Sequence, residues 1–112
     1  MLIEKPWGSE LIIEKNNNYM VKKLFMKKGH RCSLQYHEKK IETIFVLNGL
    51  IEIEMGEIGK ELTTKLYEPG QYITLQHMTV HRMIAKEDSL YLEASTPELD
   101  DVIRISDDYN RK

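Results

Sequence analysis

The chain has 112 residues, of which 16 are basic and 18 acidic. This length suits one domain with an ordinary core, predicted to span residues 1–112, and the near balance of charge excludes a basic field for nucleic acid or for an anionic membrane surface. The single cysteine excludes an internal disulfide and fits a reducing compartment. The first residues lack the basic and apolar regions of a signal peptide, and no segment has the roughly 20 apolar residues of a membrane helix, so we expect a cytoplasmic protein.

Short segments rich in β-branched, aromatic and aliphatic residues predict an all-β fold. In chain order, the predicted strands are 11–14, 19–26, 42–47, 50–55, 61–67, 71–75, 80–85, 89–94 and 102–105. Asn48-Gly49 is expected to form the tight turn of a hairpin, because both residues tolerate a positive φ. Turns about 8–12 residues apart are typical of a sandwich or barrel. Residues 97–112 are predicted to form a tail with one short strand and a charged end that frays.

Four residues, Gln35, His37, Glu42 and His81, have the types and spacing to bind one divalent metal ion. If 31–37 is a strand, its alternation places Gln35 and His37 on one face, together with Arg31 and Ser33. Glu42 and His81 each begin a row of apolar residues that face the same way. A carboxylate in such a row needs a cation or a hydrogen-bond donor. We therefore predict that the four side chains converge at one open end of the fold.

The spacing of these residues resembles the two motifs of the cupins. Gly29, five residues, Gln35-Tyr36-His37, four residues, Glu42, six residues and Gly49 resemble the first motif, with glutamine at a common histidine position. Gly70, ten residues and His81 resemble the second motif, although Gln76, Met78 and Ala85 replace its usual proline, glycine and asparagine. The resemblance implies a small antiparallel β-barrel of jelly-roll type with a metal inside. Zinc is the expected ion, with manganese, iron, nickel and cobalt as alternatives.

Further blocks resemble the type II phosphomannose isomerase domain, a cupin that interconverts mannose 6-phosphate and fructose 6-phosphate. These blocks are Lys5-Pro6-Trp7-Gly8, Leu34-Gln35-Tyr36-His37, His81-Arg82 and residues 100–105 with Tyr109. In that family the Gln, His, Glu and His positions bind the metal. Glu38-Lys39-Lys40 and Thr43-Ile44 replace a His-rich stretch and a His-Trp pair of the family, and the segment between Glu93 and Asp100 is shorter. We therefore expect a changed pocket wall around an intact metal site.

Aldose–ketose isomerisation through an enediolate requires a positive centre at two substrate oxygens and a base near the transferred proton. Glu93 is the first candidate for the base, because it lies on a predicted strand and the matching family position carries glutamate. His77 is the second candidate, with an ordinary pKa close to working pH. Arg31 and Ser33, on the face of Gln35, are expected to contact substrate. Lys39, Lys40 and Arg82 are alternatives near the rim.

Several of these residues also have a structural interpretation. His37 and His81 could be hydrogen-bonded core histidines in a metal-free cupin, and Glu93 could pair with Arg31. Lys39-Lys40 could be a solvated turn, and Arg82 could form an outer salt bridge. Trp7 could pack near the entrance or against a partner subunit, and Cys32 could be a small buried hydrophobe that faces away from the ligands.

The leading functional hypothesis is a metal-dependent sugar-phosphate isomerase serving nucleotide-sugar or polysaccharide synthesis. The alternatives are a metal-dependent sugar epimerase or dioxygenase, and a non-catalytic sugar-binding or regulatory cupin. We also expect a homodimer, with the apolar segment Leu11-Ile12-Ile13 as an exposed strand that pairs across a symmetric interface.

Overall fold

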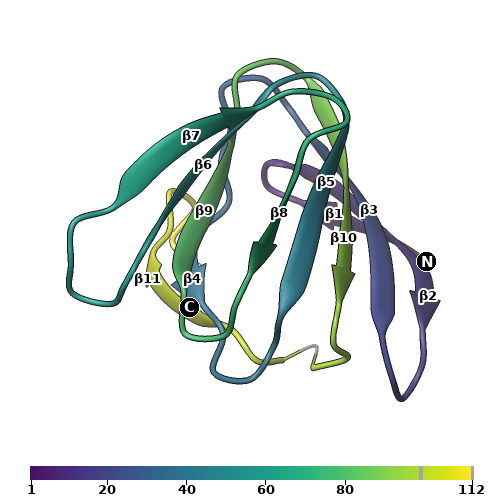
Figure 1. Cartoon of the computed structure of the whole chain (residues 1–112). Coiled ribbons are helices and arrows are strands. Elements are labelled where there is room, and N and C mark those ends of the chain that lie inside the picture. The colour runs from purple at the N-terminus through teal and green to yellow at the C-terminus, as the bar shows by residue number, and fades with distance from the viewer. Residues whose placement is uncertain (99, 112) are drawn as a thin grey trace.

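The computed structural model describes residues 1–98 and 100–111, whose strands form two antiparallel sheets that face each other (Figure 1). The six-stranded sheet has the order β1 (Leu2–Lys5), β2 (Gly8–Lys15), β3 (Met20–Met26), β10 (Ser89–Ser95), β5 (Glu42–Asn48), β8 (Tyr72–Leu75). The five-stranded sheet has the order β11 (Ile103–Ser106), β4 (Leu34–Tyr36), β9 (Val80–Ala85), β6 (Ile51–Gly56), β7 (Thr63–Tyr67). The all-β jelly roll is confirmed, although the described strands are not hydrogen-bonded into one closed barrel.

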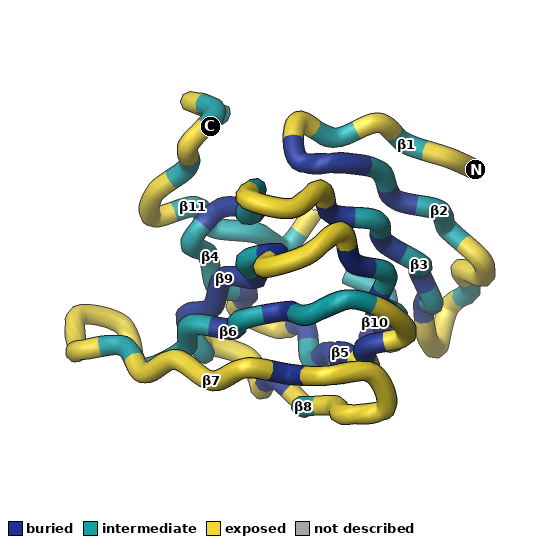
Figure 2. The backbone as a smooth tube through the Cα atoms, turned by 90° about the horizontal axis from the view of Figure 1, so that it is seen from above, coloured by how far each residue is buried: buried dark blue, intermediate teal, exposed yellow. Residues whose placement is uncertain are grey.

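The core lies between the sheets and follows the period of two along each strand. On β3 every second residue is buried, from Met20 to Met26, and the intervening residues are half-buried. Inward side chains of both sheets make up the core, including Leu24, Met26, Ile44, Val46, Ile51, Ile53, Met83 and Tyr91. Figure 2 shows this burial along β3, β9 and β10, whereas β7 is exposed along most of its length. Within the described residues, no helix has the length and hydrophobicity needed to span a bilayer.

The turn at Asn48-Gly49 has a different role from the predicted one. The chain passes through it from β5 in one sheet to β6 in the other, so the two strands are not hydrogen-bonded as a hairpin. Gly49 has a φ of 88°, and a Cβ at this position would collide with the Ser89 side chain and lie 2.5 Å from the carbonyl oxygen of Asp88. Glycine is therefore required where the backbone changes sheet.

Strands near both chain termini pair with the sheets. β1 pairs with β2, with Leu2 opposite Leu11, and the amide of Ile12 donates to the carbonyl oxygen of Met1 at 3.0 Å. This pairing overturns the expectation of 11–13 as an unpaired strand. β11 pairs with β4, and the Arg31 guanidinium contacts Asp108 beyond it at 2.6 Å. The described part of the tail is thus anchored rather than frayed, while residues 99 and 112 lie outside the described residues.

Candidate metal centre

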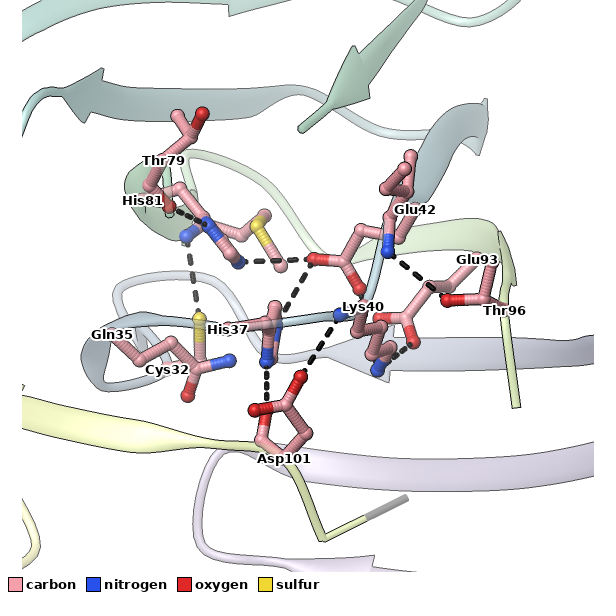
Figure 3. A network of polar contacts seen from close by, with 12 residues as sticks. Cys32, Gln35, His37, Lys40, Glu42, Thr79, His81, Glu93, Thr96 and Asp101 are labelled. Carbon is pink, nitrogen blue, oxygen red and sulfur yellow. Dashed lines mark hydrogen bonds and ion pairs between the residues drawn. The ribbon is translucent and has the colours of Figure 1, made fainter. Parts of the chain in front are cut away.

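Three of the four predicted metal ligands converge from the two facing sheets. His37 follows β4, His81 lies on β9, and Glu42 begins β5 of the other sheet. Their side chains are almost fully buried, and one potential ligand atom from each lies within 4.8 Å of the others (Figure 3). Glu42 belongs to the buried row of β5, as its alternation predicted.

Hydrogen bonds to the backbone fix the orientation of both imidazole rings. His37 Nδ1 contacts the carbonyl oxygen of Asp101, and His81 Nδ1 lies 3.0 Å from the carbonyl oxygen of Thr79. Because a carbonyl oxygen can only accept, each Nδ1 carries the proton. In the neutral rings, the lone pairs of both Nε2 atoms therefore point into the cluster, which is the arrangement that metal-binding histidines use.

The atoms left inside this cluster fit a cation. His81 Nε2 lies 3.0 Å and His37 Nε2 lies 3.6 Å from Glu42 Oε1, yet none of these three buried atoms has a hydrogen-bond partner of acceptable geometry among the described residues. Burial opposes ionisation of Glu42, but protonated His37 and His81, which would donate from Nε2, and the Lys40 ammonium lower the pKa of its carboxyl well below the ordinary value. The two Nε2 lone pairs and the carboxylate oxygens are all negative, so they repel one another unless a proton or a metal ion lies between them. The donor set, two imidazoles and one carboxylate, suits a divalent transition metal.

Gln35, the fourth predicted ligand, lies beside this cluster. It is directly opposite His81 in the pairing of β4 with β9 and lines the adjoining cavity. Its Oε1 accepts a hydrogen bond of 2.5 Å from the buried hydroxyl of Ser33. Ser33 therefore holds the amide oxygen of Gln35.

A cavity of about 140 Å³ adjoins the cluster, with His37 and Gln35 in its wall. Its charged lining residues come from β1, β2, β3, β10, β11 and neighbouring loops, and they are Lys5, Glu10, Lys22, Lys40, Glu93, Arg104 and Arg111. Apolar walls are formed by Trp7, Leu24, Met83, Tyr91 and Val102. The excess of cations over carboxylates around this space favours an anionic ligand.

Glu93 is buried in the cavity wall within a chain of ion pairs. Lys40 Nζ lies 3.1 Å from Glu93 Oε2 and 3.4 Å from Glu42 Oε2, so one ammonium bridges two carboxylates (Figure 3). On the other side, Lys22 Nζ lies 4.0 Å from Glu93 Oε2 and 2.9 Å from Glu10 Oε1. Burial, and then the charge of Glu42, raise the pKa of Glu93 although both lysines oppose the rise. The suggested pairing of Glu93 with Arg31 is wrong.

The structure places the other predicted candidates outside the cavity. Arg31 makes only an isolated bridge to Ile84 rather than continuing β4, and it pairs with Asp108 at the surface. His77 lies exposed between β8 and β9, and Lys39 is exposed next to Lys40. Arg82 is buried, but instead of an outer salt bridge it donates to the carbonyl oxygens of Cys32 and Ser106.

Two further residues differ from their predicted environment. Lys40 was expected in a solvated turn but is only 6% exposed. Cys32 is buried as predicted, but it lines the same cavity as Gln35 instead of facing away from the ligands. β4 is too short to carry the alternation back to residue 32. Trp7 lies in the cavity wall, near its expected place.

Sequence reasoning also missed several cavity residues. Lys22 offered a signal, because it interrupts an apolar row of period two on β3 between Met20 and Leu24. Arg111 lies in the tail that was expected to fray. Nothing local in the sequence indicates that the tail returns to this cavity.

Comparison with solved structures supports the same fold. The structure of KdgF from Halomonas sp. superposes with a TM-score of 0.77 at 23% identity, covering 90% of this chain and 89% of that chain. At this level of identity the match establishes a shared fold and nothing finer.

Sequence comparison identifies longer relatives. The chain is 27% identical over 121 residues to the xanthan biosynthesis protein XanB of Xanthomonas campestris, covering 97% of this chain and 23% of XanB. It is 27% identical over 106 residues to the mannose-1-phosphate guanylyltransferase RfbM of Salmonella typhimurium, covering 90% of this chain and 21% of RfbM. The chain thus spans less than a quarter of either relative. A family model described as mannose-6-phosphate isomerase C-terminal matches residues 2–107, so the chain belongs to this family of cupin domains.

Proposed function

We propose that the chain is a metal-dependent sugar-phosphate isomerase that interconverts an aldose phosphate and a ketose phosphate of the mannose 6-phosphate and fructose 6-phosphate type. One observation carries the proposal: a donor cluster of two imidazoles and a carboxylate adjoins a cavity that also holds a buried glutamate and an excess of cations. The names of XanB and RfbM refer to xanthan biosynthesis and to mannose-1-phosphate guanylyl transfer, which supports a place in polysaccharide or nucleotide-sugar synthesis.

His37, Glu42 and His81 would hold the ion, with Gln35 as a neutral oxygen donor nearby. A divalent ion bound there would supply positive charge beside the substrate oxygens on which negative charge develops. One carboxylate among the ligands leaves a net positive charge at the site, which favours an enediolate. We propose zinc as the ion, with manganese, iron, nickel and cobalt as alternatives.

Glu93 is the proposed base that moves a proton between adjacent substrate carbons. It lies in the cavity wall, and burial raises the pKa of its carboxyl, so the group is a stronger base than an exposed glutamate. Lys40 holds Glu93 Oε2 at 3.1 Å and restricts the positions that the carboxylate can take. Glu93 would take the proton from one carbon and return it to the neighbouring carbon.

The cavity cations are proposed to bind the substrate phosphate. Arg104 contributes a guanidinium group from β11 and Lys5 contributes an ammonium from β1, whereas the Arg111 guanidinium in the same wall is paired with Asp107 at 3.0 Å. Guanidinium groups bind phosphate oxygens through paired hydrogen bonds. This assignment replaces the sequence-based expectation of Arg31, which lies outside the cavity wall.

Turnover by the metal-loaded chain tests the proposal. We expect interconversion of mannose 6-phosphate and fructose 6-phosphate, followed by NMR, to stop on chelation and to resume when the ion is restored. Glu93→Gln should keep the ion and lower kcat by about 100-fold, consistent with the loss of one general base. Glu52→Gln, a matched change on β6 away from the cavity, should leave the rate unchanged. A metal-loaded chain that converts no hexose, pentose or heptose phosphate would overturn the proposal.

A specific contact favours a second candidate, a non-catalytic sugar-binding cupin. The Lys40 ammonium lies 3.4 Å from Glu42 Oε2 and offers the carboxylate a positive partner without any metal. For this candidate, sugar phosphates should raise the melting temperature of metal-free protein with no turnover. Stabilisation by sugar phosphates that is seen only in metal-loaded protein would instead favour the metal-dependent function.

A further inference from the structure

The short loop between His37 and Glu42 is held almost entirely by side chains of the C-terminal segment. Asp101 accepts hydrogen bonds from three consecutive amides, those of Glu38 at 3.0 Å, Lys39 at 2.7 Å and Lys40 at 2.9 Å. The next amide, that of Ile41, donates to Thr96 Oγ1 at 3.1 Å. Every backbone N–H group of this loop therefore depends on a residue that lies more than 50 positions later in the chain.

Asp101 also contacts one of the candidate ligands directly. Its carbonyl oxygen accepts the hydrogen bond from His37 Nδ1 that turns Nε2 toward Glu42 (Figure 3). The carbonyl group of Asp101 thus orients the ring of His37, and its carboxylate holds the loop that follows His37.

The loop also positions the side chains of His37, Glu42 and Lys40. It joins His37, at the end of β4, to Glu42, at the start of β5, and these strands belong to different sheets. It also presents the buried Lys40 side chain to Glu42 and Glu93. A change in the loop would therefore alter the spacing between two ligands and displace the ammonium that bridges two carboxylates.

We propose that Asp101 is a positioning residue of the metal centre. Its carbonyl oxygen orients His37, and its carboxylate fixes the loop that sets the separation of His37 from Glu42 and the position of Lys40. A carboxylate that merely capped an exposed turn would affect stability alone, whereas this one is expected to affect ion affinity. The inference depends on the metal centre of the proposed function but not on the isomerase reaction.

Ion affinity and local amide exchange test this role together. Asp101→Asn keeps one oxygen acceptor but brings an NH₂ group against backbone N–H groups, so we expect hydrogen exchange of amides 38–40 to accelerate. We expect the affinity for Co²⁺ or Zn²⁺, measured by calorimetry, to fall about tenfold to 100-fold, the usual effect of losing a partner that orients ligands. The visible spectrum of bound Co²⁺ should change with the ligand geometry.

Two further variants separate positioning from stability. Asp100→Asn alters the exposed neighbouring carboxylate and should leave ion affinity and exchange as in the wild type. Thr96→Val removes the acceptor of one loop amide without touching His37, so its effect on affinity should be smaller than that of Asp101→Asn.

Wild-type ion affinity in a folded Asp101→Asn protein with accelerated exchange at 38–40 would overturn the proposal, because the loop would then move without consequence for the ion. If Asp101→Asn did not fold, a wild-type affinity in Asp101→Glu with accelerated exchange would overturn it equally. A wild-type chain that binds no divalent ion would overturn it together with the metal centre. Neither readout depends on turnover, so a failure of the isomerase proposal alone would leave this result unchanged.

Discussion

The thiol of Cys32 illustrates how enclosure controls reactivity at the scale of one residue. The side chain is buried in the cavity wall, and its Sγ accepts a hydrogen bond from the amide of Met83 at 3.3 Å. Burial raises the pKa of Cys32 to about 11, against the opposing effects of that hydrogen bond and the charge of Arg82. The reactive thiolate is therefore scarce at neutral pH.

We predict that Cys32 resists alkylation in the folded protein. Relative to a thiol of ordinary pKa 9.0, a pKa of about 11 lowers the thiolate fraction near pH 8 by about 100-fold. Iodoacetamide modification, followed by mass spectrometry, should be slower than in guanidinium-unfolded protein by at least that factor. Equal rates in the two states would contradict the enclosed position of the side chain.

Single residues also show which parts of the site a sequence can reveal. The spacing of His37, Glu42 and His81 predicted their convergence, because period-two alternation and motif spacing are local properties. The environment of Lys40 was not predictable in this way. Lys39 and Lys40 are identical side chains in one turn, and only the pairing of distant strands places Glu93 beside the second of them.

At the scale of elements, most of the strands but not their partners could be predicted. Alternation identified β3, β5 and β9 closely, whereas the Asn48-Gly49 turn was assigned to a hairpin. A glycine with positive φ suits a tight hairpin and a crossing between sheets equally well. The choice depends on which strands pair, and pairing is decided by the packing of both sheets around the core.

Substituting the glycine at this crossing should be more costly than substituting a glycine in an open turn. Gly49→Ala adds a Cβ that collides with Ser89, whereas a Cβ added at Gly59, which has a φ of 78°, would meet no atom of the described residues within 4 Å. Gly59→Ala should lower the free energy of unfolding by about 1 kcal/mol through backbone strain alone. Gly49→Ala should cost at least twice as much in a urea titration. Equal losses of unfolding free energy in the two variants would show that the Ser89 side chain moves aside without destabilising the fold.

The segment after β11 is fastened by an ion pair that makes stability depend on pH. Hydrogen bonds from Arg111 hold the pKa of Asp107 at about 2, against the effect of burial. Because this pKa is below the ordinary 3.8, the stabilisation is complete above pH 3.8 and disappears as pH falls through about 2.

Asp107→Asn should lower the unfolding free energy at neutral pH by about 2 kcal/mol and flatten its dependence between these two pH values. Asp108, whose side chain is 39% exposed, pairs with Arg31 and provides a matched control. Asp108→Asn should cost less, because solvent screens its ion pair. A larger loss for Asp108→Asn in thermal unfolding at several pH values would contradict this ranking.

At the scale of the whole molecule, the outer surface of the six-stranded sheet is unusual for so charged a chain. The outward residues of β10, β5 and β8 are all uncharged, and they are Thr43, Phe45, Leu47, Tyr72, Thr74, Leu90, Leu92 and Ala94. Phe45 lies opposite both Leu92 and Tyr72 in the pairing, which makes a continuous apolar row. Outward positions of β6 in the other sheet carry Glu52 and Glu54 instead.

We expect this uncharged face to pair with a second copy of the chain. The three strands cover roughly 300 Å² by strand spacing, about a third of one side of a standard interface, and a neutral face is complementary to itself. Phe45→Glu should convert a dimer to a monomer in analytical ultracentrifugation. Leu66→Glu, which changes an exposed leucine of the other sheet, should leave the dimer intact. A monomeric wild-type chain would contradict the expectation.

The candidate ligands come from opposite layers of the fold, with His37 and His81 in one sheet and Glu42 in the other. An ion bound to all three would link the two sheets, which share no hydrogen-bonded pair of strands in the described part of the chain. The free energy of binding is then added to the free energy of folding, and unfolding must release the ion. The melting temperature should therefore rise with ion concentration, whether or not any sugar is converted.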